Sequence, residues 1–390
     1  MIAPSKKLRW SWRSASFRRI VYQIVAIVVV FAIGAYLVRN TLYNMRARGI
    51  QSGYDYLAQP AGFAISESLF EFDSSDTYAR AFLIGLSNTL RVAVVGIVLA
   101  TIVGTTIGIG RLSRNVLIRS LCTAYVETFR NVPLLLQLFI WYFVLTEFLP
   151  PIDEALQPLP DVFFSKNGLQ FPIPVWTPGY LWLALGAFAG CIGAWAWNRF
   201  ASRRHEITGK SLPLLVPMLA IIVAGGLVGW WVGGAPSALD VPEKTEITVV
   251  GGGAVTPEFL TVLIGLTLYT ASYIAEIVRA GIQAVAYGQH EAAAALGLSR
   301  GQEIRLILLP QALRVIIPPI TSQYLNLTKN SSLAVAVGYP DLVSVSTTSL
   351  NQTGRAIEAI SLVMLAYLTL SLVTAAVMNW YNARAKIRER

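Results

Sequence analysis

Eight apolar segments of the chain are long enough to cross a membrane, since about 20 helical residues span the roughly 30 Å hydrocarbon core of a bilayer. Four segments carry no charge and cover residues 20–38, 180–197, 211–234 and 359–383. The other four contain, in turn, Arg91, Glu147, Glu276 and Lys329, and cover residues 84–110, 132–149, 257–280 and 313–338. We therefore predict an all-α polytopic membrane protein with about eight transmembrane helices.

Composition supports this prediction. The 390 residues are 55% hydrophobic and 13% charged, whereas a soluble chain has about 25% charged residues. The shortage of charge is explained if much of the surface faces lipid, where a charged side chain is costly. The first segment follows a basic stretch, as the core of a signal peptide does. It ends without a small-residue cleavage site, so we expect an uncleaved anchor.

The positions of the basic residues predict sidedness. If all eight segments cross, alternate connections lie on one side, and 22 of the 31 Lys and Arg residues fall there while 7 fall on the other side. The connections of the basic side are residues 1–19, 111–131, 198–210, 279–314 and 384–390. The positive-inside rule then places both termini in the cytoplasm. The basic residues form no compact domain, so the net charge of +10 does not indicate nucleic-acid binding.

Small residues recur at every fourth position of the second segment: Gly96, Ala100, Gly104 and Gly108. They form one helical stripe where a neighbouring backbone can approach closely. Ordinary packing between helices of one chain and a subunit interface both fit this pattern.

Two short motifs resemble catalytic ones, but their context argues against catalysis. Gly209, Lys210 and Ser211 match the end of a phosphate-binding loop, which needs glycine where Arg204 stands and a preceding strand. Residues 297–301 match the G-x-S-x-G pattern of a serine nucleophile, which needs a strand where the chain has an alanine-rich helix former. Two cysteines and two histidines are too few and too scattered for a zinc site. We expect no metal, no cofactor on this chain and no enzymatic activity.

The connection at 281–312 carries the most specific pattern. Residues 291–296 form a short predicted helix whose acidic first residue suits the positive end of the helix dipole, with glycine after it and proline at the start of the next segment. The alanines of this helix are short enough to enter a cleft in another protein. The residues of the pattern are Glu291, Ala292, Ala293, Gly297, Ile307, Leu309 and Pro310. Their spacing resembles the EAA loop of permease subunits of ATP-binding-cassette importers, which implies that they dock on an ATPase.

Further motifs resemble the polar amino-acid permeases of these importers. They are Glu127, Arg130, Pro133 and Gln137 in one stretch, and Glu276 and Arg279 in the other. The resemblance covers about residues 84–381 and implies a type I importer core of five helices, plus one N-terminal helix and two inserted helices. The domains implied are an N-terminal basic stretch, helix and periplasmic loop (1–83), two core parts (84–149 and 257–383), an insert (150–256) and a basic tail (384–390).

The same resemblance implies the partners and the place of the chain in the cell. We expect a multi-pass subunit of the bacterial inner membrane. Its expected partners are ATPase subunits, a second permease chain that is either identical or different, a periplasmic amino-acid-binding protein and the lipid bilayer. Asn131 and Val132 after Arg130, and Asn330 and Ser331 after Lys329, depart from the commoner family pattern. These departures resemble the branch that imports a broad range of L-amino acids.

A polar stripe in the seventh segment is the candidate substrate path. Ser322, Asn326, Lys329 and Asn330 lie at i, i+4, i+7 and i+8, on one helical face, and a polar stripe in lipid faces a cavity or another helix. Lys329 either binds the carboxylate of a substrate or has a structural role, and the sequence leaves both open. Arg91 is a weaker candidate of the same kind.

Two other classes of protein compete with an ATP-driven permease. An ion- or proton-coupled secondary transporter would show inverted repeats and broken helices around acidic residues in mid-membrane. No repeat is visible, and the acidic residues of the segments lie near their ends. A membrane enzyme is the third class.

Overall fold

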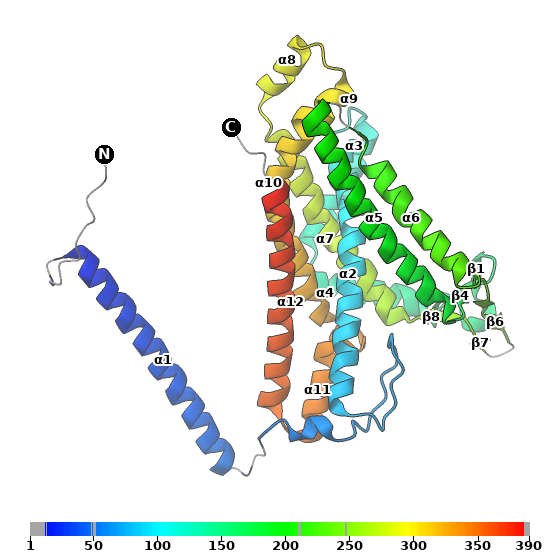
Figure 1. The fold of residues 1–390 in the computed structure, drawn as a ribbon. Helices are drawn as coiled ribbons and strands as arrows, with labels where there is room; N and C mark the ends of the chain where they lie inside the picture. Colours follow the sequence, from blue (N-terminus) through cyan, green and yellow to red (C-terminus); the bar gives the residue numbers. More distant parts are fainter. Residues whose placement is uncertain are drawn as a thin grey trace. The chain divides into compact units, whose positions relative to one another are not determined.

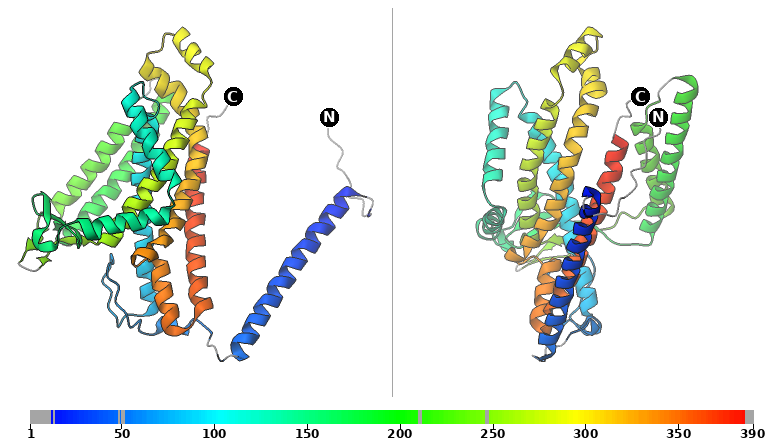
Figure 2. Two further views of the ribbon diagram at one scale, coloured as in Figure 1. Left: turned by 180° about the vertical axis from the view of Figure 1, so that it is seen from behind. Right: turned by 90° about the vertical axis from the view of Figure 1, so that its left-hand side faces the viewer.

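A computed structural model describes residue 12, residues 14–47, residue 49, and residues 52–209, 212–245 and 248–385 (Figures 1 and 2). Most of the predicted basic stretches 1–19 and 384–390, namely residues 1–11 and 386–390, lies outside the described residues, as do the motif residues Lys210 and Ser211. The chain divides into two compact units, one made of Met1–Val132 and Leu266–Arg390 and the other of Pro133–Gly265.

Long helices dominate the first unit. Its α-helices are α1 (Ala15–Ala47), α2 (Tyr78–Gly110), α3 (Val116–Asn131), α8 (Tyr287–Ala295), α9 (Arg300–Glu303), α10 (Leu309–Asn330), α11 (Leu342–Thr353) and α12 (Ala356–Ala385). Helix α7 (Pro257–Gln283) begins in the second unit and continues into the first. Two 3-10 turns, η1 (Asp55–Ala58) and η5 (Ser331–Val337), and a π turn, η4 (Ile304–Leu308), complete this unit.

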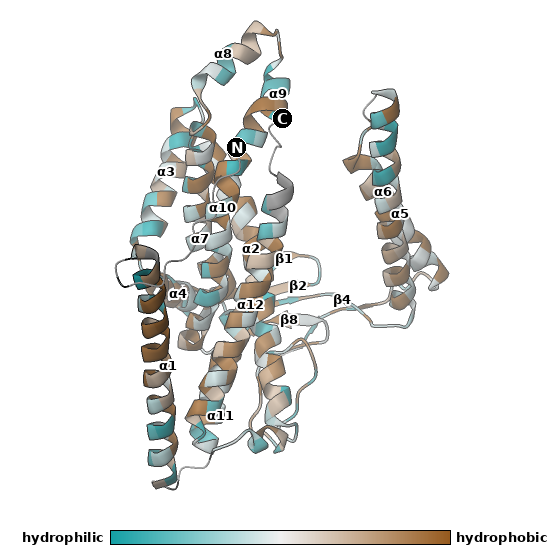
Figure 3. Cartoon of the chain, turned by 60° about the vertical axis from the view of Figure 1, so that its left-hand side comes forward, coloured by the Kyte–Doolittle hydropathy of each residue, from teal (hydrophilic) through white to brown (hydrophobic). Residues whose placement is uncertain are grey.

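The predicted spans are confirmed as helices. Within the described part of the chain, seven helices are long and apolar enough to cross a membrane, and α3 with α4 makes an eighth if that bent pair counts as one span. In Figure 3 hydrophobic colour runs along much of α1, while α8 and α9 carry hydrophilic residues. The multi-pass architecture therefore agrees with the pattern of the sequence.

The third predicted span differs from its prediction. Helix α4 (Leu134–Phe143) continues as a π turn, η2 (Val144–Phe148), and the two cover only about 22 Å. The predicted connection before it, residues 111–131, is mostly helical as well, since residues 116–131 form α3. Pro133 separates the two helices, since proline pushes the residue before it out of the helical region, and Val132 has φ −94° and ψ 129°.

Close packing of α2 on α7 uses the predicted stripe of small residues. Gly96, Ala100, Gly104 and Gly108 are all buried. A Cβ atom at Gly104 would lie 2.7 Å from Ile274 Cβ, and one at Gly108 would lie 2.7 Å from the carbonyl oxygen of Ala275. Here the stripe serves ordinary packing within one chain at Gly104 and Gly108.

The segment of residues 52–77, between α1 and α2, packs on α2, α11 and α12. Tyr56 and Ala61 are buried in a cluster that these helices complete with Tyr78, Ala81, Phe82, Leu342, Val345 and Ala359. Arg355, the residue before α12, donates to the Gly53 carbonyl oxygen at 2.6 Å and to Asp55 at 2.5 Å. The hydrogen bond from Arg355 lowers the pKa of Asp55.

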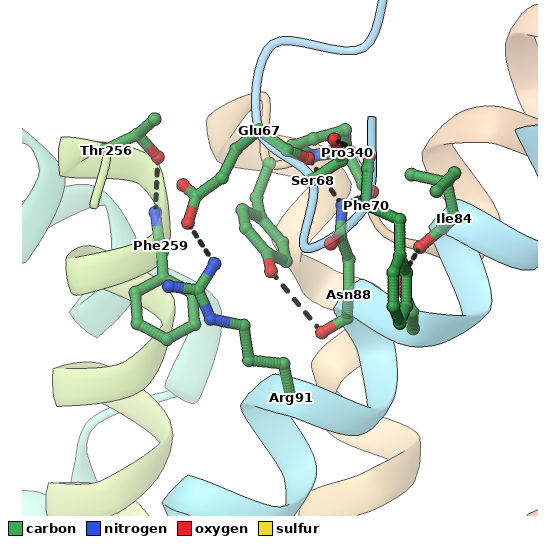
Figure 4. Close-up of polar contacts among 11 residues, drawn as sticks. Glu67, Ser68, Phe70, Ile84, Asn88, Arg91, Thr256, Phe259 and Pro340 are labelled. Carbon is green, nitrogen blue, oxygen red and sulfur yellow. Dashed lines mark hydrogen bonds and ion pairs between the residues drawn. The ribbon is translucent and has the colours of Figure 1, made fainter. Parts of the chain in front are cut away.

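The same segment reaches α2 at a second place, shown in Figure 4. Glu67 forms an ion pair with Arg91. The side-chain amide of Asn88 donates to the carbonyl oxygens of Glu67, at 2.8 Å, and of Pro340, at 2.9 Å. Neither this segment nor helix α11 was expected from the hydrophobic pattern as a packed element.

The second unit contains a helical hairpin and small sheets. Helices α5 (Gly179–Thr208) and α6 (Leu215–Val232) pack through glycines, because a Cβ atom at Gly186 would lie 2.3 Å from the Gly225 carbonyl oxygen. One sheet has the antiparallel order β1-β2-β3-β8, and β4-β5 and β6-β7 are two-stranded. The strands are β1 (Leu156–Leu159), β2 (Val162–Ser165), β3 (Gly168–Phe171), β4 (Ile173–Pro174), β5 (Leu239–Asp240), β6 (Glu243–Lys244), β7 (Val249–Val250) and β8 (Gly253–Val255), and a 3-10 turn, η3 (Ile152–Glu154), precedes them. Strands of two to four residues give no readable alternation, so the sequence did not predict them.

Candidate functional site

The helix predicted at 291–296 is confirmed as the C-terminal part of α8, which begins four residues earlier, at Tyr287, and ends at Ala295. As predicted, a glycine follows the C-terminal end of this helix. Gly297 adopts φ +67°, a backbone conformation that glycine tolerates best. The N–H of Gly297 donates to the Ala294 carbonyl oxygen at 3.0 Å, and that of Leu298 donates to the Ala293 carbonyl oxygen at 3.1 Å. Pro310 is the second residue of α10 and lies directly after the π turn η4.

The two faces of α8 differ. Glu291 and Ala292 are exposed, and two large apolar side chains at its ends, Tyr287 and Leu296, are each 75% exposed. Ala293 is only 1% exposed. The outer face is therefore available to another protein, while Ala293 belongs to the face that is packed within this chain.

Hydrogen bonds fix the inner face of α8 to the elements that follow it. Nδ1 of His290 is paired with a carboxylate oxygen of Glu303, the last residue of α9. The side-chain amide of Gln311, in α10, donates to that of Gln289 at 3.1 Å. Ile307 is half-buried in the π turn between α9 and α10, and Leu309 is 48% exposed.

The G-x-S-x-G motif is a helix-to-helix turn, because it lies between α8 and α9. Ser299 precedes α9, and both its backbone N–H and its hydroxyl donate to the Gln302 side chain at 2.9 Å. Its hydroxyl thus serves a helix start. Among the residues that the structure describes, no three His, Cys, Asp or Glu side chains form a group that could hold a metal ion.

The two stretches that resemble amino-acid permeases meet in the first unit. Arg111, next to the end of α2, forms an ion pair with Glu276 of α7. Nε of Arg279 donates to the same carboxylate at 3.2 Å. The guanidinium of Arg130 lies 5.2 Å from the centre of the Tyr273 ring, within range of a cation–π interaction.

The remaining members of these stretches are separated. Glu127 is exposed on α3. Pro133 stands at the break before α4, and Gln137, in α4, is 4% exposed.

A polar pocket of about 270 Å³ lies between α7 and α10. All of its lining side chains are uncharged. Helix α7 contributes Tyr269, Thr270 and Tyr273, and helix α10 contributes Gln323, Asn326 and Asn330. The hydroxyls of Tyr269 and Tyr273 are 3.2 Å apart. Hydroxyl and amide groups both donate and accept hydrogen bonds, so this pocket can bind a small polar solute without selecting its charge.

The structure separates the predicted substrate-path residues into three places. Asn326 and Asn330 line the pocket, whereas Ser322 and Lys329 are exposed on α10 outside it. Arg91 is ion-paired with Glu67 of the same chain. Sequence reasoning missed the pocket members Tyr269, Thr270 and Gln323. The signal was present, since polar residues at 269, 270 and 273 interrupt an otherwise apolar span.

Comparisons with known proteins agree with this architecture. The model of the family described as binding-protein-dependent transport system inner membrane component matches residues 183–387. The general L-amino acid transport system permease protein AapQ of Rhizobium johnstonii is 46% identical over 385 residues, which cover 98% of this chain and 96% of the relative.

A second relative and one solved structure are also similar to this chain. The glutamate/glutamine/aspartate/asparagine transport system permease protein BztB of Rhodobacter capsulatus is 41% identical over 406 residues, which cover 96% of this chain and 95% of that protein. A crystal structure of an amino acid ABC transporter with histidines aligns with a TM-score of 0.46 and 18% identity, over 79% of this chain and 95% of that one. From the family match and the near full-length relatives, the chain belongs to the inner membrane components of binding-protein-dependent transport systems, which are transport subunits and not enzymes.

Proposed function

We propose that this chain is the permease subunit of an ATP-driven importer that carries L-amino acids of broad range from the periplasm to the cytoplasm. The observation that carries the proposal is 46% identity, over nearly the whole of both chains, to a protein described as a general L-amino acid transport permease. The uncharged lining of the pocket between α7 and α10 supports a broad range, because none of its side chains would repel an acidic or a basic substrate.

The polar face of α10 supports a second permease chain as a partner. Ser322, Asn326 and Lys329 are exposed on this face. Polar groups in the hydrocarbon core need a polar partner or water, because lipid offers neither. A second permease chain, identical or different, that encloses a water-filled path against this face would supply both. In this arrangement Lys329 is positioned to attract a substrate carboxylate.

The exposed outer face of α8 supports docking on an ATPase subunit, which would bind and hydrolyse the ATP. The predicted distribution of basic residues supports a cytoplasmic position for this helix and for both termini. It leaves the opposite side for a periplasmic binding protein that delivers the amino acid. The chain would then convert movement of α8 into alternating access of the path along α10.

Uptake in reconstituted vesicles tests the proposal. Vesicles holding the full complex, loaded with ATP, should take up radiolabelled glutamate from the binding protein, and other L-amino acids should compete. Vanadate should stop uptake and a proton ionophore should not. Uptake that ignores vanadate and stops with the ionophore would instead establish a secondary transporter.

Two variants on α10 test the path. Lys329→Met should raise the half-saturating substrate concentration in a complex that still assembles. Ser322→Ala, on the same exposed face, is the matched control and should change it less. Unchanged uptake by Lys329→Met, or loss of assembly, would assign Lys329 a structural role.

A further inference from the structure

The inner face of α8 is held by three contacts that share one direction. His290 is paired with Glu303, and Gln289 accepts a hydrogen bond from Gln311 at 3.1 Å. Ala293, one turn after His290, is 1% exposed. All three residues lie within five consecutive positions of α8, so a single patch attaches this helix to α9 and α10.

Such contacts are needed because α8 is too short to hold its own position. It has nine residues, and isolated helices below about 12–15 residues are marginal in water. The turn at Gly297 sets where the helix ends, but it is formed by backbone hydrogen bonds within residues 293–298 and makes no contact with α10. The direction of α8 therefore depends on its side-chain contacts.

The pair of His290 with Glu303 is the strongest of these contacts, because it includes a carboxylate, whereas the hydrogen bond of Gln289 with Gln311, which reaches α10 directly, joins two neutral amides. Glu303 is the last residue of α9, and the π turn η4 connects it directly to α10. Its side chain is 17% exposed, against 40% for His290, so water screens the pair only in part. A force on α8 would thus reach α10, which carries the polar face, through one side-chain contact and one helical turn.

We infer that His290 and Glu303 are positioning residues that couple movement of α8 to α10. This inference rests on the proposed function, because it assumes that an ATPase moves α8. It goes beyond docking: the outer face of α8 binds the partner, and the brace of His290 and Glu303 converts that binding into movement of the transport path. Without the brace, ATP hydrolysis continues but moves less substrate.

The test measures the ratio of amino-acid uptake to ATP hydrolysis in reconstituted complexes. His290→Ala and Glu303→Ala should each lower this ratio about five-fold or more, since a hydrogen bond to a charged group is lost, while the ATPase still co-purifies. The double variant should be no worse than either single one, because both remove the same contact. Arg300→Ala, which removes an exposed charge from the same segment, is the control and should keep the wild-type ratio.

A conservative variant separates positioning from general stability. His290→Asn places its amide nitrogen near the position of Nδ1 and should restore most of the ratio, whereas His290→Gln places its amide nitrogen near Nε2 and should not. Equal ratios in His290→Asn and His290→Gln would overturn the inference. This comparison remains valid even if the alanine variants fail to insert into the membrane. A wild-type ratio in His290→Ala, or loss of the ATPase from Glu303→Ala, would overturn it as well. Failure of the proposed function would appear differently, as a wild-type chain that binds no ATPase.

Discussion

Replacing Gly104 by valine tests the packing of α2 on α7. A Cβ atom at this position would lie 2.7 Å from Ile274 Cβ and 2.8 Å from the Ala271 carbonyl oxygen. Ordinary contacts between such atoms begin near 3.4 Å, so the two helices have to separate. Valine adds two further methyl groups on the same side, and α7 offers backbone there, which cannot rotate away.

The cost follows from the overpacking of a dense helix contact. Extra carbon atoms forced into such contacts cost about 1–3 kcal/mol. Each kcal/mol shifts the melting temperature by about 2–4 °C in chains of about 150–250 residues, and by less in a longer chain such as this one. We therefore expect Gly104→Val to lower the melting temperature by several degrees. Separation at Gly104 also strains the ion pair of Arg111 with Glu276, which joins the same two helices further along.

The assay is thermal unfolding of the purified chain in detergent, followed by size-exclusion chromatography after heating. Gly34→Val in α1 is the matched control, because no atom lies within 4 Å of a Cβ placed there and the change in helix propensity is the same. Equal melting of the two variants would refute close contact of α2 with α7. A normal monomer that no longer joins a second permease chain would place the stripe at a subunit interface instead.

Four further outcomes are expected. Ala292→Arg, on the exposed face of α8, should abolish co-purification of the ATPase while membrane insertion persists, and retained co-purification would contradict docking through this face. Reporter fusions should place Arg300 in the cytoplasm and Asp73 outside, and the reverse result would remove the assignment of sidedness. Arg355→Ala should expose the 52–77 segment to protease, because it removes the donor to Asp55 and Gly53. Arg355 lowers the pKa of Asp55 from its ordinary value of 3.8. The contact should therefore persist above pH 3.8 and weaken as the pH falls further. Proteolysis of the wild-type segment should then become faster, whereas proteolysis of Arg355→Ala should not change with pH.

The sequence by itself determined the features that depend on local chemistry. Apolar length alone predicts the spans, because a helix satisfies its own backbone hydrogen bonds in lipid wherever its side chains are apolar. Gly297 and Pro310 set the limits of the docking segment, because their backbone preferences act within one or two residues. The family motifs belong to the same category, since their spacing can be read without knowing which helices meet.

The tertiary structure decided which residues face one another. The sequence placed Asn326 and Lys329 on one stripe, but only the position of α7 shows that Asn326 lines a pocket with Tyr269 while Lys329 stays outside it. The ion pair of Arg91 with Glu67 joins a residue of α2 to a residue of the segment before α2. No hydrophobic periodicity predicts this pair.

The same limit applies to α8. Ala292 and Ala293 are neighbours of identical type, yet one is exposed and the other buried, because the chain returns after Gly297 and η4 packs against one side of the helix. Side-chain type determines what a residue can bind. Which surface the residue contacts depends on how segments distant in the sequence pack together. The hydrophobic pattern does not contain that information.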